Sequence, residues 1–403
     1  MNQVLSDVAT GHRGRWVVLA ALIGVYFSFG IVVSSLAPVL TVVREELNVS
    51  RSQMGLALGA WAMIFIVTAP IAGRFIDRFG LGWAVTIGGL SIAASAAARA
   101  AAQGFGSLWF AVALFGVGGP LVSAAAPTLV TIWFPDESER RRSVGIYVVA
   151  PTLGGAAALA LTNSFLLPLF GTWRGVLLAE ASFAVVATAM WVVVYTRTAD
   201  GTQPVAAARA KGGGFTSLLG SKSVRFAFAI AFSIFFVQHA LLGWLPTMLG
   251  ELGSVSAGAA STWVATASLL GVTAAIVVPR YANERRRVPL FIFVWLVICG
   301  ALLALGAGPE AAAVPATLVL GVRNTLLPLG VLFLMEADGV DSSNAGLANG
   351  LWFSIGEVGG VSGPVVVGLV SDSSGGFSSA ALVLAAVAGI TALITLLFTV
   401  SQS

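Results

Sequence analysis

Charged residues are scarce in this chain. Asp, Glu, Lys and Arg make up only 9% of its 403 residues, whereas soluble domains carry about 25%. Hydrophobic residues make up 58%, and the mean hydropathy is +0.95. This composition excludes an ordinary soluble globular protein and indicates a polytopic membrane protein.

The residues that build most metal sites and enzyme sites are also few. The chain has one cysteine, Cys299, and two histidines, so it can form no intramolecular disulfide and shows no Cys/His pattern of a metal site. No glycine-rich stretch follows a strand as a phosphate-binding loop does, and no nucleophile–base set is visible. The basic run 140–142 follows acidic residues, which favours a contact with the loop or with anionic lipid over nucleic acid. We therefore expect no cofactor, no metal, no enzyme activity and no nucleic-acid partner.

Long apolar runs fill the rest of the sequence. A membrane-spanning helix needs about 20 mostly apolar residues, and we count twelve such runs. The sequence therefore predicts an all-α polytopic membrane protein, with twelve transmembrane helices in two pseudo-symmetric six-helix bundles. The predicted spans are residues 16–42, 52–73, 82–103, 107–133, 143–166, 173–197, 223–248, 257–279, 288–307, 311–335, 344–370 and 377–400.

The basic residues between these runs predict the orientation. If the N-terminus is cytoplasmic, 16 of the 21 Lys and Arg residues fall on the cytoplasmic side, which is a strong positive-inside bias. We expect a multi-pass protein of the plasma or inner membrane with both termini in the cytoplasm. The basic residues expected on the outer side are Arg44, Arg51, Arg99 and Arg174.

The two halves of the chain resemble each other. Gly116 and Gly321 lie in matching glycine-containing stretches 205 residues apart, and Gly154 and Gly359 are separated by the same offset. A flexible Gly- and Ala-rich stretch separates the halves. We predict an N-terminal bundle at residues 1–197, a cytoplasmic linker at 198–222 and a C-terminal bundle at 223–403. Parallel repeats of this kind are typical of secondary transporters, whose site lies at the repeat interface near the membrane midplane.

A short motif between the second and third runs identifies a family. Gly73 is followed four residues later by Asp77-Arg78 and then by Gly80. This pattern resembles the signature loop of the major facilitator superfamily, although Leu81 stands where the family usually has a basic residue. The resemblance implies transport by alternating access and a monomer. It also implies a gating role for Asp77, which would close the cytoplasmic side in the outward-open state against the N-terminus of the eleventh helix.

Two further stretches resemble different branches of that family. The element Pro151-x-x-Gly154-Gly155 is similar to one in proton-coupled drug antiporters. The segment from Gln238 to Pro246 is similar to the corresponding stretch of the cyanate and nitroimidazole branch. These two resemblances imply different substrates.

Arg323 and Glu357 are charged residues near the middle of predicted spans. A charge there costs at least about 2.5–3.5 kcal/mol and indicates function. In one hypothesis, Arg323 binds an anionic substrate through its fork of donors, and Glu357 carries the coupling proton. In a second, the two form a structural ion pair that binds nothing. In a third, Arg323 pairs with Glu357 in one state and with the substrate in another.

Several polar and aromatic residues could complete a substrate site. Gln238 and His239 interrupt the apolar seventh run, and either a substrate contact or simple packing would explain them. Tyr26, together with Tyr147 and Trp352, which are again 205 residues apart, could form opposed cavity walls or ordinary core.

The remaining charged residues of the spans are expected to be structural. We expect this of Glu180 because it lies only about two turns from a helix end. Arg99 and Arg174 lie near helix ends, and we expect their charged heads to reach the membrane surface. Asn324 should point away from Arg323 and serve packing.

The leading hypothesis is a secondary active transporter of a small organic anion, a proton-coupled symporter embedded in the lipid bilayer. One alternative is a proton-coupled drug or multidrug efflux antiporter. Another is a non-transporting membrane sensor, which would show no substrate flux.

Overall fold

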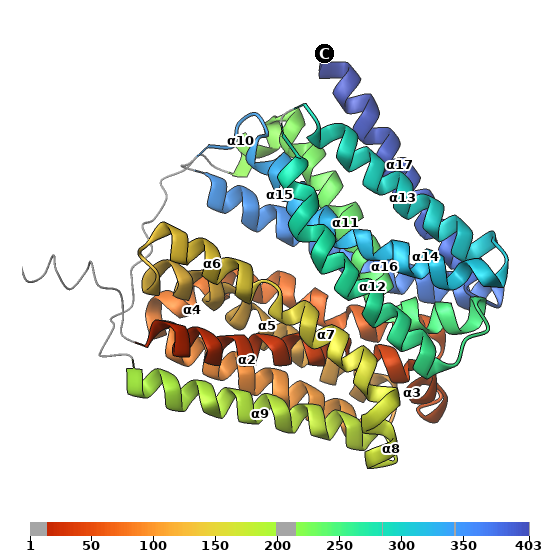
Figure 1. The fold of residues 1–403 in the computed structure, drawn as a ribbon, viewed down its shortest axis with the longest axis horizontal. Helices are drawn as coiled ribbons and strands as arrows, with labels where there is room; N and C mark the ends of the chain where they lie inside the picture. Colours follow the sequence, from red (N-terminus) through yellow and green to blue (C-terminus); the bar gives the residue numbers. More distant parts are fainter. Residues whose placement is uncertain (1–13, 199–214, 284, 342–343, 403) are drawn as a thin grey trace, which may run out of the picture.

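The computed structural model describes residues 14–198, 215–283, 285–341 and 344–402. Most of the predicted linker, residues 199–214, lies outside the described residues. The helices form two groups that face each other (Figure 1). We call helices α2 to α9 the N-terminal bundle and helices α11 to α17 the C-terminal bundle.

The described helices follow the predicted spans, with several short interruptions. Where adjoining segments are joined, eleven of the described helices are long and apolar enough to cross a membrane. The helical segments of the N-terminal bundle are α2 (Arg15–Ser34), η1 (Ala37–Val39), α3 (Leu40–Glu46), α4 (Arg51–Ala100), α5 (Phe105–Trp133), α6 (Glu137–Tyr147), α7 (Ala150–Leu161), η2 (Thr162–Leu166), α8 (Leu167–Phe170) and α9 (Trp173–Thr198). The rest are α10 (Phe215–Gly220), α11 (Lys222–Leu252), α12 (Ala257–Val277), η3 (Val278–Tyr281), α13 (Arg287–Ala307), η4 (Glu310–Ala312), α14 (Ala313–Val319), η5 (Leu320–Thr325), α15 (Leu326–Met335), α16 (Ala345–Ser374) and α17 (Ser378–Gln402).

Helix α4 contains two of the predicted spans. Its only non-helical residue is Gly80, with φ of 82°, a left-handed conformation that glycine adopts without strain. The α5 residue Gly116 packs on Trp61, and its neighbour Gly118 packs on Gly88. Because residues 61 and 88 lie beside the same turn of α5, the chain must reverse between them. The predicted twelve spans are therefore present, but residues 73–79 are helical and only Gly80 makes the turn.

Matching glycine contacts confirm that the two halves are built alike. A Cβ at Gly154 of α7 would overlap the carbonyl of Phe27 in α2, and a Cβ at Gly359 of α16 would overlap the carbonyl of Phe232 in α11. Both members of the second pair lie 205 residues after those of the first. Small residues allow such close helix approach in membranes, so the sequence offset corresponds to a repeated contact in space.

The described residues of the two bundles pack together from one end of the molecule to about mid-depth. We call the end where α2 begins and α17 finishes the terminal end, and the other the opposite end. At the opposite end, Gly55 and Gly59 of α4 pack directly on Pro364 and Val361 of α16. One hydrophobic core also continues across both bundles there, whereas a second core lies within the N-terminal bundle. In Figure 1 the bundles converge at the right and separate toward the left, where α2 begins.

Hydrogen bonds and ion pairs close the opposite end. Arg51, at the start of α4, pairs with Glu251 of α11 at 2.8 Å. The Asp372 carboxylate of α16 accepts hydrogen bonds from the backbone N–H groups of Arg51, at 3.1 Å, and Ser52, at 2.7 Å, and from the Ser52 hydroxyl. Asn163 of η2 donates to Ser261 of α12 at 3.2 Å. At the terminal end, Gly350 of α16 has no non-neighbouring atom within 4 Å of an added Cβ.

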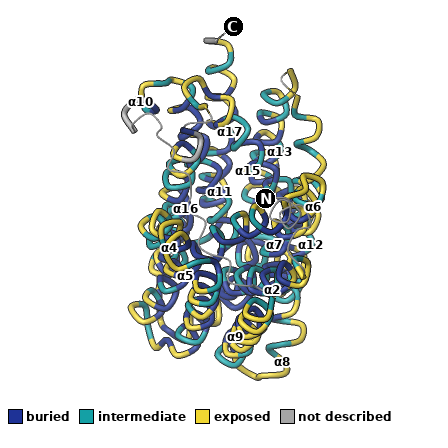
Figure 2. Tube along the Cα trace, turned by 90° about the vertical axis from the view of Figure 1, so that its left-hand side faces the viewer, coloured by how far each residue is buried: buried dark blue, intermediate teal, exposed yellow. Residues whose placement is uncertain are grey.

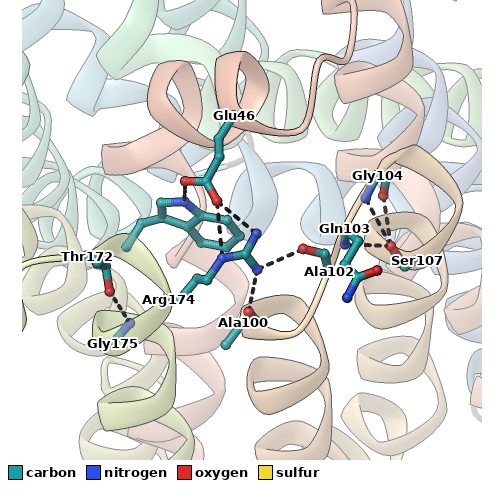
Figure 3. A network of polar contacts seen from close by, with 10 residues as sticks. Glu46, Ala100, Ala102, Gln103, Gly104, Ser107, Thr172, Arg174 and Gly175 are labelled. Carbon is teal, nitrogen blue, oxygen red and sulfur yellow. Dashed lines mark hydrogen bonds and ion pairs between the residues drawn. The ribbon is translucent and has the colours of Figure 1, made fainter.

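A separate network fixes the opposite end of the N-terminal bundle (Figure 3). Arg174 of α9 pairs with Glu46 of α3 at 2.8 Å and donates to the carbonyls of Ala100 and Ala102 at 2.6 and 2.7 Å. Trp173 donates to the same glutamate at 2.6 Å. The prediction that Arg174 simply reaches for the membrane surface was incomplete, because its guanidinium satisfies carbonyl groups at the end of α4.

Burial follows the membrane pattern. Figure 2 shows buried residues between the helices and exposed residues along the outer surfaces. Large apolar side chains such as Phe110, Phe293 and Leu397 are more than half exposed. In a bilayer, such side chains would contact lipid tails instead of water.

Candidate functional site

The bundles touch near mid-depth through Trp61 and His239. Trp61 lies ten residues into α4 from the opposite end, and His239 lies in the second half of α11. Their ring centroids are 4.9 Å apart, with an interplanar angle of 38°. His239 also lies 5.6 Å from the ring of Phe235, one turn earlier in α11. This ring contact joins two bundles that would have to move relative to each other in a transport cycle.

Glu357 lies beside His239 inside the C-terminal bundle. The distance from Glu357 Oε2 to His239 Nδ1 is 3.6 Å, and the glutamate is only 4% exposed. Neither of these two atoms has a hydrogen-bond partner. A Cβ at Gly360, one turn after Glu357, would overlap the imidazole. The glycine therefore makes the space that lets the imidazole lie against α16.

Arg323 lies in η5, a tight helical turn that interrupts the tenth span. It is 4% exposed, its Nη1 donates to the Leu320 carbonyl at 3.1 Å, and its Nε has no partner. Gln238 of α11 donates to the Arg323 carbonyl at 3.1 Å. A side chain thus satisfies a backbone carbonyl at the interruption. Within the described residues, no ion pair joins Arg323 to Glu357, and the glutamate lies beside His239 instead.

Asn324 has the packing role that the sequence predicted. Its side-chain amide donates to the Ser268 carbonyl of α12 at 3.4 Å. It also packs against Gly271 on the same helix. Arg323 and Asn324 therefore serve different neighbours although they are adjacent in sequence.

Aromatic rings extend from Tyr147 across the N-terminal bundle to the inter-bundle contact. Tyr147 lies 6.1 Å from Tyr26, centroid to centroid. The following contacts are Tyr26–Phe29 at 5.6 Å, Phe29–Phe115 at 4.7 Å and Phe115–Trp61 at 5.7 Å. The structure thus connects three predicted site residues, Tyr26, Tyr147 and His239, through rings that the sequence did not single out.

Trp352 belongs to the core of the C-terminal bundle. It is fully buried, lies 5.6 Å from the ring of Phe235 and packs on Gly330. Tyr147 and Trp352 each pack within their own bundle, and the structure does not bring the two rings together. Packing therefore accounts for the position of Trp352 in this structure.

Arg99 was placed wrongly by the sequence. It is 1% exposed, and its Nη1 donates to the Val32 carbonyl at 2.6 Å and to the Ser35 hydroxyl at 2.9 Å. Its charged head therefore lies against the end of α2 and not at the membrane surface. Together with Trp61, Arg99 is a residue that the prediction missed. The sequence signal that could have singled out Arg99 was its place among the few basic residues expected on the outer side of the membrane.

The signature motif lies at the terminal end. Gly80 makes the turn of α4, while Asp77, Arg78 and Gly73 are exposed. Arg78 lies over the ring of Phe79, with 5.4 Å from Cζ to the centroid. Among the described residues, Asp77 makes no hydrogen bond or ion pair, and Gly73 has no non-neighbouring atom within 4 Å of an added Cβ.

The arrangement provides binding and proton-holding groups in place of catalytic ones. The described residues contain no group of three or more His, Cys, Asp or Glu side chains that could hold a metal ion. A cation, a buried carboxyl group and an imidazole lie on three elements of the C-terminal bundle, η5, α16 and α11, and the ring of Trp61 contacts the imidazole from the other bundle. Such a set can bind a small polar solute and exchange a proton.

Comparisons with known proteins agree with this picture. The chain is 24% identical over 366 residues to the hexuronate transporter of Bacillus subtilis (strain 168), covering 84% of each protein. It is 24% identical over 377 residues to the 2-nitroimidazole transporter of Escherichia coli (strain K12), covering 91% of each. Its fold matches a crystal structure of a nucleoside transporter with a TM-score of 0.75 at 12% identity, over 94% of this chain and 99% of that one.

The family follows from the extent of the sequence match. The model of the Major Facilitator Superfamily matches residues 22–338, from within the first span through the whole of the tenth. That range is well over half of the 403 residues and includes the signature motif. This protein therefore belongs to the Major Facilitator Superfamily and is a transporter of small solutes in a membrane.

Proposed function

We propose that this transporter carries a small organic anion by alternating access, coupled to protons. The observation that carries the anion assignment is Arg323, a buried guanidinium at a helix interruption whose Nε has no partner. An unsatisfied cationic donor in the membrane interior is costly. A carboxylate would satisfy it, since guanidinium and carboxylate match in geometry.

Glu357 is the proposed carrier of the proton. Burial without a hydrogen-bond partner for Oε2 favours a neutral carboxyl group over a carboxylate. His239 lies 3.6 Å away and contacts Trp61 of the other bundle. A change in the charge of Glu357 would therefore act directly on the contact that joins the bundles.

The conformation supports alternating access. The opposite end is closed by Arg51, Glu251 and Asp372, whereas Asp77 at the terminal end is exposed. We infer that the terminal end is cytoplasmic and that the structure corresponds to an inward-open state of a monomer in the plasma or inner membrane. In the outward-open state, Asp77 would reach the N-terminus of α16, where helix dipole and free N–H groups favour an anion.

A sugar acid is the substrate class we favour. The hexuronate transporter among the relatives is named for such an anion, and a buried arginine suits it. The relative named for 2-nitroimidazole keeps drug efflux as a second candidate. The Pro151 element that resembles drug antiporters packs on α2, where Gly30 contacts the Pro151 carbonyl. Its packing role is compatible with either substrate.

Uptake into proteoliposomes tests the proposal. Labelled D-glucuronate and 2-nitroimidazole would be offered to wild-type protein and to Arg323→Gln. Arg141→Gln is the matched control, because that arginine is 73% exposed and contacts only Glu137 on its own helix. We expect glucuronate uptake by the wild type and the control, and at least a tenfold loss in Arg323→Gln. Full uptake by Arg323→Gln would refute the anion site, and the absence of any flux would favour the sensor alternative.

A further inference from the structure

Arg99 is a buried cation, and two of its guanidinium nitrogens make no hydrogen bond. Two hydrogen bonds use its Nη1, but Nε and Nη2 are buried and have no partner. The ring of Phe115 lies 5.9 Å from its Cζ, which is a weak cation–π distance. Its position is thus fixed by α2 while part of its guanidinium fork stays available.

Glu180 of α9 is a buried acidic residue that interacts electrostatically with Arg99. Both of its carboxyl oxygens are buried without hydrogen-bond partners. The structure shows no ion pair between the two within 4 Å. A pair built only for stability would be expected to satisfy its donors and acceptors mutually. This one leaves both sides incomplete.

Arg99 lines a cavity that both bundles share. Trp61 and Val112 of the N-terminal bundle and His239 and Gly243 of the C-terminal bundle are among its other walls. Its volume of about 20 Å³ is room for about one water molecule. Because opposite walls belong to different bundles, separation of the opposite end would widen it.

A larger cleft of about 360 Å³ lies at the opposite end, between elements of both bundles. The cleft is lined by Ala37 and Pro246, and the Arg99 cavity by Leu36 and Gly243. Gly243 and Pro246 lie three residues apart on α11, or about 4.5 Å along the helix. The two spaces therefore follow each other along the same two segments.

We propose that Arg99 forms an outer carboxylate-binding subsite, which receives the anionic group of the substrate from the opposite end before the substrate reaches the level of Arg323. This inference rests on the proposed transport of an organic anion. The subsite is contracted in the present conformation and opens when the Arg51–Glu251–Asp372 contacts separate.

Ligand protection of a cysteine in the cavity wall tests the subsite. Leu58 lines the cavity, so Leu58→Cys would be introduced into a Cys299→Ser background that also carries Asp372→Asn to favour opening. Labelling by a membrane-impermeant maleimide would be followed in right-side-out vesicles, with D-glucuronate or neutral D-glucose as the protecting probe. We expect D-glucuronate to slow labelling and D-glucose to leave it unchanged.

Two variants separate binding from folding. Arg99→Gln/Glu180→Gln replaces both buried ionisable groups together, so no buried charge is left unpaired. It should raise the glucuronate concentration for half-protection at least tenfold. Arg99→Lys should retain part of the protection, because the positive charge remains. Unchanged protection in the double variant would overturn the subsite.

The outcome can be distinguished from failure of the proposed function. If wild-type protein takes up glucuronate but the double variant is protected like its parent, the transport proposal stands and the subsite is refuted. If glucuronate neither protects nor is transported, both are refuted. Protection that requires Arg99 without net uptake would support the subsite and refute transport of this anion.

Discussion

Asp372 should control which end of the transporter is open. It lies near the C-terminal end of α16, where the helix dipole disfavours an acid, and its carboxylate instead accepts from the first backbone N–H groups of α4. Asp372→Asn removes the charge and one of the two acceptor oxygens. We expect it to shift the equilibrium toward opening of the opposite end.

The size of the shift can be estimated from the contacts. A hydrogen bond to a charged group contributes about 1.5–3 kcal/mol, but Asp372 is exposed and solvent screens part of this. A net loss of about 1–2 kcal/mol is reasonable, which is a factor of about 5 to 30 in the ratio of closed to open molecules. Because Asn can still accept one hydrogen bond, the contact is weakened and not abolished.

The assay is the labelling rate of Leu58→Cys from the opposite end in a Cys299→Ser background. Asp372→Asn should raise that rate by about the same factor of 5 to 30. Glu310→Gln is the matched control, since this exposed acid at the same end makes no contact with the other bundle among the described residues. An unchanged rate in Asp372→Asn, or an equal increase in the control, would refute the role of Asp372.

Three further predictions follow from other contacts. Glu357→Gln should abolish glucuronate accumulation driven by a pH gradient while retaining exchange of labelled for unlabelled substrate; retained accumulation would move the proton site elsewhere. Gly359→Ala should lower the midpoint of thermal unfolding in detergent, because its Cβ would overlap the Phe232 carbonyl, whereas Gly350→Ala on the same helix should leave it unchanged or raise it. Trp61→Ala should reduce the transport rate more than tenfold if the ring contact with His239 is needed, and a rate within twofold of wild type would show that it is dispensable.

Much of the fold could be predicted because membrane burial requires continuous apolar length. The spans, the two-bundle plan and the repeat all follow from apolar runs and from glycines at a fixed offset. Boundaries were less predictable, as α4 shows. Residues 73–79 looked like a loop because they are charged, but a helix can extend beyond the bilayer, and only Gly80 adopts a non-helical conformation.

The candidate site was only partly predictable. Arg323 and Glu357 were found because a charge in an apolar run is conspicuous, but their partners depend on which faces the helices present. Helix rotation places Glu357 beside His239 and leaves Arg323 with Gln238. Arg99 was misjudged because sequence position gives depth along a helix and says nothing of the direction of the side chain.

The central claim is that Arg323 serves proton-coupled transport of an organic anion. It is tested most directly by measuring labelled D-glucuronate in proteoliposomes under an imposed pH gradient, for wild type and for Arg323→Gln. The account predicts accumulation above the external concentration by the wild type, its collapse when a protonophore removes the gradient, and at least a tenfold lower initial rate for the variant. Equal accumulation by both proteins, or wild-type uptake that ignores the pH gradient, would contradict it.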